Sequence, residues 1–246
     1  MNKREKRELL HIQIEDETIK ASDIDIDLVM GYRGIYNRVI KRIVDIVLAV
    51  IILICVSPIY VCVAIAIAAE DGLPILYKAD RGGLHGKKFK IYKFRSMVKN
   101  ADKIGGGTTA LNDSRITRVG SVIRKMKIDE IPNLLNVIKG DASFIGPRPE
   151  LLRYTNLYTG TEKTILEVRP GMTDYSSIEF INLDEIVGGE NADEMYECYV
   201  LPKKNKLRVK YAATVSLATD IKLFFLTIFK VLQKCYRFVA ENKHDQ

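Results

Sequence analysis

One apolar stretch, residues 43–69, constrains this chain more than any other feature of its sequence. It exceeds the roughly 20 residues that an α-helix needs to cross the hydrocarbon core of a bilayer. The stretch begins too far from the N-terminus for a cleaved signal peptide, and no small-residue cleavage site follows it. A membrane helix is therefore expected, and its simplest form is a straight transmembrane span.

Two features of the stretch favour a helix that bends back. Ser57-Pro58 falls near its middle. Proline lacks an N–H and disrupts the preceding turn, and a serine hydroxyl can bond the carbonyl that is freed. Basic residues flank both sides, and positive flanks stay in the cytoplasm. These residues are Arg38, Lys41, Arg42, Lys78, Arg81, Lys87 and Lys88.

Each arm of such a hairpin would have about 14 residues and a length of about 21 Å, which is less than the bilayer core of about 30 Å. Proline-kinked helices that span a membrane are nevertheless common. The residues alone therefore leave the re-entrant hairpin and the transmembrane span both open.

Composition limits what the rest of the chain can be. Its 246 residues suffice for one sizeable domain besides the membrane element. A mean hydropathy close to zero argues against a polytopic membrane protein and a disordered chain. The net charge of +7 attracts nucleic acid, anionic lipid or phosphorylated metabolites. Four cysteines without a CxxC pair and three scattered histidines argue against a disulfide framework, a histidine metal site and a Ser-His triad.

Outside the apolar stretch, the residue pattern predicts a small α/β domain. Residues 74–98 have the pattern of strand, turn and strand, since apolar and aromatic residues surround Gly82-Gly83 and Gly86. The other expected segments are a loosely ordered extension (1–37), a mobile loop (99–114), helices (116–138 and 151–167), a rigid loop fixed by prolines (140–150) and a turn (169–173).

The C-terminal segment has the pattern of an amphipathic helix, with apolar residues on one face and basic residues on the other. This pattern suits a helix that lies on an anionic membrane surface, and equally a helix that packs on the domain core. The apolar face comprises Ile221, Phe224, Phe225, Ile228, Leu232 and Cys235, and the basic face comprises Lys222, Lys230, Lys234 and Arg237.

The candidate chemical centre is Asp129-Glu130, within the basic segment 124–132. Adjacent carboxylates among cations usually form a solvated, salt-bridged helix end. In phosphoryl transfer, however, a carboxylate can attack phosphorus and form an acyl phosphate. A second carboxylate can hold Mg²⁺, which neutralises a diphosphate. Neighbouring cations keep the nucleophile ionised.

Three further basic residues fit phosphate recognition. The loop 146–149 is stiffened by two prolines and presents Arg148, whose guanidinium suits bidentate phosphate binding. Lys93 and Arg95 alternate along a presumed strand and would share a face. A surface turn and a solvated edge strand are the ordinary explanations. With the membrane anchor, these groups fit a lipid phosphate and a nucleotide diphosphate as substrates.

Several long motifs, in the same order, resemble the monotopic phosphoglycosyl transferases, the bacterial sugar transferase family that starts glycoconjugate assembly on undecaprenyl phosphate. The resemblance extends over residues 38–233. Its motifs are KRIVD (41–45), Ser57-Pro58, KFKIYKFRSM (88–97), SRITRVGSVIRKMKIDEIPNLLNVIKGDASFIGPRPE (114–150), RPGMT (169–173) and SLATDIKLFFLTIFKVL (216–232).

The resemblance implies a small α/β catalytic domain on the cytoplasmic face of the bacterial inner membrane. It also implies a re-entrant helix broken at Ser57-Pro58 and amphipathic helices at the membrane interface. The expected boundaries are an N-terminal extension at 1–37, the membrane helix at 38–70 and the catalytic domain at 71–240.

The same resemblance implies the roles of single residues. Asp129 is the nucleophile that attacks the β-phosphate of a UDP-sugar, releases UMP and carries the phosphosugar until undecaprenyl phosphate attacks. Glu130 binds Mg²⁺ together with Asp129. Lys93, Arg124 and Arg148 match phosphate-contacting positions, Asp220 matches an acidic position near the active site, and Arg95 is a further substrate-binding candidate from the strand pattern.

One segment departs from the family pattern. Many members carry an Arg-Asn pair after the PGxT turn, and the corresponding residues here are Ile181-Asn182. The arginine, and any contact with sugar or phosphate that it would make, is therefore not expected in this chain.

Two other functions compete with catalysis. A non-catalytic scaffold at the membrane surface, binding anionic lipid or a partner protein, would need only the anchor and the basic faces. A nucleic-acid binder is disfavoured by the apolar stretch and by the lack of a recognisable binding module. The expected partners are a UDP-sugar, undecaprenyl phosphate and inner-membrane lipid, without nucleic acid, and a homodimer is left open.

Overall fold

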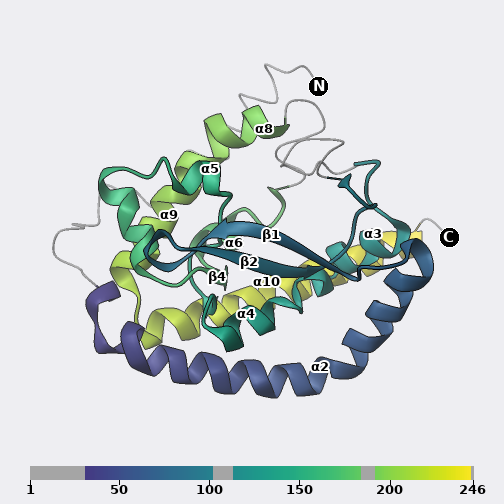
Figure 1. Ribbon diagram of the computed structural model, residues 1–246, viewed down its shortest axis with the longest axis horizontal. Helices are drawn as coiled ribbons and strands as arrows, with labels where there is room; N and C mark the ends of the chain where they lie inside the picture. The colour runs from purple at the N-terminus through teal and green to yellow at the C-terminus, as the bar shows by residue number, and fades with distance from the viewer. Residues whose placement is uncertain (1–30, 102–112, 184–191, 245–246) are drawn as a thin grey trace.

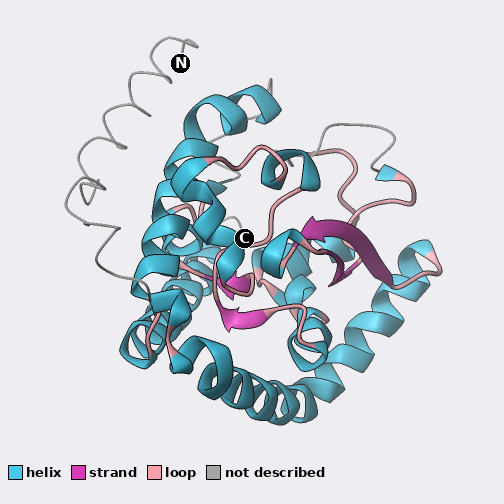
Figure 2. Cartoon of the chain, turned by 60° about the vertical axis from the view of Figure 1, so that its left-hand side comes forward, coloured by secondary structure: helices cyan, strands magenta, loops and turns pink. Residues whose placement is uncertain are grey.

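The computed structural model describes residues 31–101, 113–183 and 192–244. Helices enclose two pairs of short strands, which confirms a mixed α/β domain, and one long helix curves along its side (Figures 1 and 2). The helices are α2 (Lys41–Asp71), α3 (Arg118–Lys125), α4 (Asn133–Lys139), α5 (Leu152–Thr155), α6 (Tyr175–Glu179), α8 (Ala192–Met195), α9 (Leu201–Thr214) and α10 (Leu217–His244). The strands are β1 (Leu76–Gly82), β2 (Lys88–Phe94), β3 (Ser143–Ile145) and β4 (Gly171–Thr173). Shorter or irregular helical segments lie at Gly31–Arg33, Tyr36–Ile40, Leu84–Gly86, Ile128–Glu130, Gly160–Glu167 and Tyr196–Val200.

The apolar helix α2 is continuous through Ser57 and Pro58, so the expected helix break is not seen. Pro58 cannot donate to the carbonyl of Ile54 one turn earlier. The Ser57 hydroxyl donates to that carbonyl instead, at 2.8 Å, as expected for this serine. Because the freed carbonyl keeps a partner, the helix continues and curves, and both its ends turn toward the domain (Figure 1). The segment Tyr36–Asp71 is long and apolar enough to cross a membrane.

One face of α2 packs against the domain over most of the helix. Toward the N-terminal end, Ala49 lies in a buried cluster with Leu134 of α4. Toward the C-terminal end, Ile67 packs with Phe94 and Ile123. Exposed apolar side chains on the rest of the helix include Ile43, Val47, Ile51, Ile54, Val61 and Ile65. An exposed apolar surface of this length suits contact with lipid.

Polar contacts hold both ends of α2 to the domain. At the N-terminal end, the Arg42 guanidinium donates to two carbonyl oxygens in the last turn of α4. At the other end, Glu70 accepts from the backbone N–H groups of Arg118 and Val119, at 2.8 and 3.0 Å. These are helix-terminal groups without a partner inside their own helix, and opposite charges stabilise them.

The two sheets are small and carry the loops of the candidate site. β1 and β2 are antiparallel, with Leu76 opposite Phe94, which confirms the predicted strand, turn and strand. β3 and β4 are parallel, with Ser143 opposite Gly171. A Cβ atom on Gly171 would lie only 2.2 Å from the backbone nitrogen of Gly146, so this close approach requires glycine.

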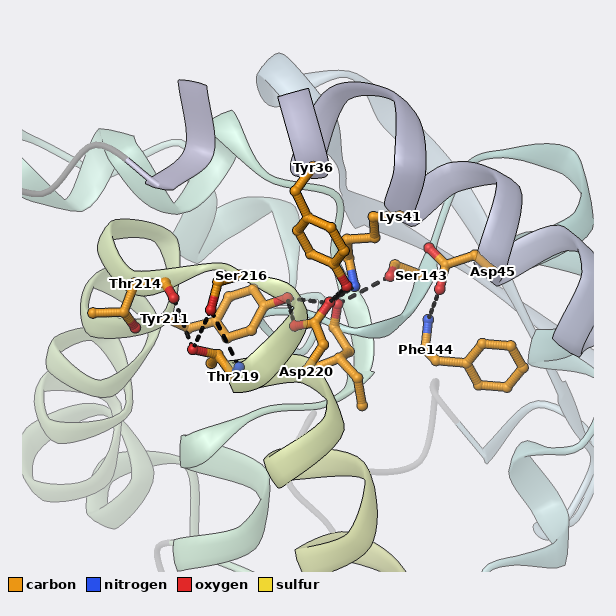
Figure 3. Close-up of polar contacts among 11 residues, drawn as sticks. Tyr36, Lys41, Asp45, Ser143, Phe144, Tyr211, Thr214, Ser216, Thr219 and Asp220 are labelled. Atoms are coloured by element: carbon orange, nitrogen blue, oxygen red, sulfur yellow. Dashed lines mark hydrogen bonds and ion pairs between the residues drawn. The ribbon is translucent and has the colours of Figure 1, made fainter. Parts of the chain in front are cut away.

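A buried polar hub around Asp220 joins α2, α9, β3 and α10 (Figure 3). Asp220, in the first turn of α10, pairs with Lys41 at 2.5 Å, and the side chains of the pair are 8% and 6% exposed. The hydroxyls of Tyr36 and Tyr211 donate to the same carboxylate, at 2.8 and 2.7 Å. The Tyr211 hydroxyl also lies 3.0 Å from the carbonyl oxygen of Ile145 in β3. The hub therefore fixes the start of the membrane helix against the start of the last helix.

The last helix, α10, is amphipathic, and it combines the two arrangements that the sequence left open. Leu223 and the half-buried Phe224 pack into the core beside Tyr211, so Phe224 belongs to the packed face. Exposed apolar side chains on α10 include Leu217, Ile221, Phe225, Ile228, Phe229, Leu232 and Tyr236. The side chains of Cys235 and Arg237 lie outside the described part of the chain.

The remaining helical expectations are met in part. Segment 116–138 contains two helices, α3 and α4, because a turn interrupts it. In segment 151–167, α5 is short, and Gly160 adopts a left-handed backbone with φ of +51° as the first residue of the 3-10 helical segment Gly160–Glu167. Residues 1–30 of the expected extension and most of the expected loop 99–114 lie outside the described residues.

Breaking the buried Lys41–Asp220 pair should destabilise the fold. Lys41→Met or Asp220→Asn alone removes one partner and should lower the free energy of unfolding by about 3–5 kcal/mol. The double variant should lose less than the sum of the two single losses, measured by denaturant unfolding in detergent micelles. The exposed pair Lys88–Asp80, at 3.5 Å, is the matched control, with a coupling below about 1 kcal/mol. Purely additive losses at the buried pair would contradict the prediction.

Candidate active site

The two candidate carboxylates lie in a tight turn between α3 and α4. Lys127 precedes the turn with a left-handed backbone, at φ of +59°. Ile128 and Ile131 pack in the same cluster as the C-terminal half of α2. Asp129 and Glu130 lie between these isoleucines and are only 8% and 9% exposed. The packing of the turn therefore holds both carboxylates close to the apolar helix.

Glu130 is paired from two sides. Lys93 on β2 donates to its Oε1 at 3.0 Å. Arg148 donates to both of its oxygens, to Oε2 at 3.1 Å, and also to the carbonyl of Met172 at 3.2 Å. Burial alone would raise the pKa of Glu130, but the charges of Arg148 and Lys93 outweigh burial and hold this pKa well below its usual range. Glu130 is therefore an anion throughout the physiological pH range.

Asp129 has a different electrostatic environment. Burial and the adjacent negative charge of Glu130 raise the pKa of Asp129, while the charges of Lys93, Lys127 and Arg124 oppose that rise. Pairs of acids whose pKa values are pushed apart occur where two carboxyl groups have different chemical tasks. An anion destabilised in this way binds a proton or an electrophile more tightly, which suits a nucleophile.

The loop that carries Arg148 is fixed in place, as its prolines predicted. The backbone N–H of Gly146 donates to the carbonyl of Thr173 at 2.8 Å, which ties the loop to β4. Two residues beyond Arg148, Glu150 pairs with the fully buried Arg208 of α9 at 2.6 Å. Arg148 is therefore held from both sides of the loop while its guanidinium reaches Glu130.

Arg95 does not join Lys93 at the carboxylates. Its guanidinium donates to the carbonyls of Asp71 and Gly72, at 2.9 and 2.7 Å, and pairs with the Asp71 carboxylate at 3.0 Å. Lys93 and Arg95, which the sequence pattern predicted to share a face of the strand, therefore have different partners, the Glu130 carboxylate and the end of α2. The contacts of Arg95 close the end of α2, and a substrate-binding role for it stays a prediction.

The other two candidates also differ in placement. Arg124, in the last turn of α3, is near enough to Asp129 for its charge to oppose the rise in the pKa of that carboxyl group. Asp220 lies in the buried hub, where both of its oxygens accept hydrogen bonds from protein side chains (Figure 3). These contacts make Asp220 part of the joint between α2 and α10, and its role toward substrate stays a prediction.

The pair of carboxylates Asp129 and Glu130, called the dyad below, fits an open magnesium site. Within the described ranges, no three acidic, histidine or cysteine side chains cluster into a closed metal site. Mg²⁺ commonly takes one or two protein carboxylates and completes its octahedron with water and substrate phosphates. Asp129 and Glu130 meet that requirement, although Glu130 would share its oxygens with Arg148 and Lys93.

Two basic residues that were not selected as site residues from the sequence also belong to this region. The charge of Lys127 lowers the pKa of both carboxyl groups. Its left-handed backbone could not be predicted, because no glycine or asparagine signals it. Lys234 of α10 donates to the carbonyl of Ile181 at 3.1 Å, and Ile181 is the residue that stands where many family members have an arginine. The positive charge of Lys234 also lowers the pKa of Lys127.

Comparison with known proteins places this chain in a family. Residues 36–234 match the family model described as "Bacterial sugar transferase". The chain is 38% identical over 194 residues to "Uncharacterized sugar transferase EpsL" of Bacillus subtilis (strain 168), and the match covers 79% of this chain and 88% of that protein.

Two relatives with a stated activity are similar over the same part of the chain. The "UDP-glucose:undecaprenyl-phosphate glucose-1-phosphate transferase" of Escherichia coli (strain K12) is 34% identical over 198 residues, which are 79% of this chain and 40% of that protein. The "UDP-N-acetylgalactosamine-undecaprenyl-phosphate N-acetylgalactosaminephosphotransferase" of Aeromonas hydrophila is 34% identical over 200 residues, which are 78% of this chain and 44% of that protein. The match thus spans less than half of these two longer relatives. Because residues 36–234 match the family model and the match to EpsL covers most of both proteins, the chain belongs to the bacterial sugar transferase family.

Proposed function

We propose that this chain transfers a sugar-1-phosphate from a UDP-sugar to undecaprenyl phosphate, the kind of reaction named for its E. coli and A. hydrophila relatives. The observation that carries the proposal is the buried Asp129-Glu130 pair, which is surrounded by basic side chains and packs beside the apolar helix α2. Such a site can receive a diphosphate from the water and a lipid phosphate from the bilayer. The products are UMP and a polyprenyl-diphosphate sugar, in the first membrane step of polysaccharide synthesis.

Asp129 is the nucleophile in the proposed mechanism. Its carboxylate oxygen forms a bond to the β-phosphorus of the UDP-sugar, while the bond from that phosphorus to the bridging oxygen breaks and UMP leaves with the electron pair. An oxygen of undecaprenyl phosphate then attacks the phosphorus of the aspartyl-phosphosugar, and the carboxylate departs unchanged. The raised pKa of Asp129 supports this role, because a more basic carboxylate is a better nucleophile.

The basic residues around the dyad stabilise the transferring phosphoryl group. Arg148 and Lys93 already contact Glu130 and so are held in position before substrate binds, which lowers the cost of organising them. Arg124 adds a third charge near Asp129. When bound at Asp129 and Glu130, Mg²⁺ would neutralise negative charge on the diphosphate.

The proposal places α2 in the membrane as a re-entrant helix, with the catalytic domain on the cytoplasmic face of the inner membrane. Arg42 and Glu70, near opposite ends of α2, bind helices of the same domain. A transmembrane span would carry these ends to opposite sides of a core of about 30 Å and would draw their polar partners toward lipid. The curvature of α2 turns both of its ends toward the domain, as a re-entrant helix requires (Figure 1).

Asp129→Asn should abolish transfer. Purified protein with Mg²⁺, undecaprenyl phosphate and a panel of UDP-sugars should release UMP with one or a few donors. The variant should lose a factor on the order of a thousand or more, because it lacks the nucleophile. With donor alone, mass spectrometry should find a phosphosugar on Asp129 of the unchanged protein. Asp80→Asn, on β1, is the matched control. Full activity in Asp129→Asn would refute the nucleophile, and a protein inactive with every donor would favour a non-catalytic scaffold.

Lys93→Met should move the acid limb of the pH–rate profile to higher pH. The pKa of Asp129 is raised, and Asp129 must be ionised to attack, so activity falls as the pH drops through this pKa. Lys93 opposes the rise, and its loss should raise the pKa further. The measurement is kcat/KM against pH, with the exposed Lys90→Met on the same strand as control. If kcat/KM of Lys93→Met falls while the acid limb of its pH profile stays in place, Lys93 acts in substrate binding and does not influence the pKa of Asp129.

Both flanks of α2 should face the cytoplasm. In a cysteine-free background, Arg38→Cys and Asp80→Cys should resist an impermeant thiol reagent in intact cells and react after lysis, since a bent helix returns to the side that it left. Labelling of one of the two positions in intact cells would establish a true span.

A further inference from the structure

Helix α3 connects the membrane helix to the candidate nucleophile. Its N-terminal N–H groups, at Arg118 and Val119, donate to Glu70 in the last turn of α2. At its other end, Met126 and Lys127 lead directly into the turn that carries Asp129. Figure 1 shows α3 beside the end of α2. One surface of a short helix therefore leads from the membrane helix to the reacting carboxylate.

The outer surface of α3 is apolar and basic at once. Ile123, on its inner side, is buried against Phe94 and Ile67. On the outer side, Val122 and Met126 are 49% and 42% exposed, although both are apolar and lie one helical turn apart. Two exposed basic residues, Lys125 and Lys127, stand beside them. We call Val122, Lys125, Met126 and Lys127 the α3 ledge.

We propose that the α3 ledge binds the polyprenyl phosphate acceptor, with the phosphate near Lys127 and the first isoprene units along Met126 and Val122. The inference rests on the proposed function and assigns the acceptor a place in that site. The acceptor joins an anionic head to an apolar chain, and the ledge presents Lys127 next to Met126, with Val122 one helical turn further from Asp129.

Geometry allows one direction of binding. The acceptor phosphate must reach Asp129, and the charge of Lys127, two residues away, acts on that carboxyl group. The chain must leave toward lipid, and α3 begins where it is attached to the membrane helix. An acceptor that satisfies both conditions runs along α3 from Lys127 back toward Val122. The acceptor ends in a phosphate monoester with up to two negative charges, whereas the phosphate of an ordinary phospholipid is a diester with one, so phospholipid should compete only weakly for the ledge.

Photo-crosslinking tests this placement without relying on turnover. A polyprenyl phosphate with a diazirine on its first isoprene unit is irradiated with the full chain in micelles, without a sugar donor. Mass spectrometry should find the label on the peptide that contains residues 122–126. Unlabelled undecaprenyl phosphate should suppress it, and phosphatidylglycerol should not. Labelling confined to α2 or α10, or equal suppression by phosphatidylglycerol, would overturn the proposal.

Kinetics of the two half-reactions provide the second test. Val122→Gln/Met126→Gln should raise the KM for undecaprenyl phosphate roughly tenfold, since two apolar contacts are lost. Exchange of labelled UMP into the UDP-sugar, which needs no acceptor, should be unchanged and shows that the variant is folded. Leu157→Gln, an exposed apolar residue near α5, is the matched control, and Met126→Leu should keep the original KM.

The outcomes separate this proposal from the proposed function. An unchanged KM for undecaprenyl phosphate in the Val122→Gln/Met126→Gln variant would overturn the proposal. A loss of UMP exchange and of sedimentation with phosphatidylglycerol vesicles as large as the loss of acceptor use would also overturn it, because α3 would then only touch the bilayer. Absence of UMP exchange in the unchanged protein would instead refute the covalent mechanism. The crosslinking result would still report on acceptor binding in that case.

Discussion

The attachment of α2 to the catalytic domain is the contact on which the rest of the structure depends. The inner face of this helix belongs to the same buried clusters as β2, α3 and α4. Its outer face carries exposed apolar side chains suited to lipid, while its inner face packs against the domain. The turn with Asp129 and Glu130 packs into the same cluster through Ile128 and Ile131. The carboxylates are therefore held beside the apolar helix by packing and not by a flexible tether.

Burying two adjacent carboxyl groups in one turn determines the electrostatics of the site. Two like charges on adjacent buried residues are unfavourable unless cations compensate them, and Arg148 and Lys93 make their direct contacts with Glu130. Asp129 is left with the raised pKa. Glu130 is thus the stable anion and Asp129 the more basic carboxylate, because Arg148 and Lys93 contact Glu130 directly. This division of roles needs no difference between aspartate and glutamate as such.

Much of this arrangement could be predicted from the sequence, because it depends on local signals. The apolar stretch, the strands around Gly82-Gly83, and the bond between Ser57 and the carbonyl freed by Pro58 are short-range features. The dyad and Arg148 were found through motifs. The placement of Arg95 and Asp220 could not be predicted from local patterns, because their partners, Asp71 and Lys41, lie 24 and 179 residues away in the sequence. The pattern also predicted a break at Pro58, where a single hydroxyl group preserves the helix.

The packing of α2 makes the anchor part of the enzyme's interior. Without residues 36–71, the side chains of Phe94, Ile123 and Leu134 would face water, and Arg95 and Asp220 would lose their ion-pair partners. The catalytic unit is therefore unsuited to release as an independent soluble fragment. A chain without this helix would have to rebuild much of its hydrophobic core to keep the carboxylates in place.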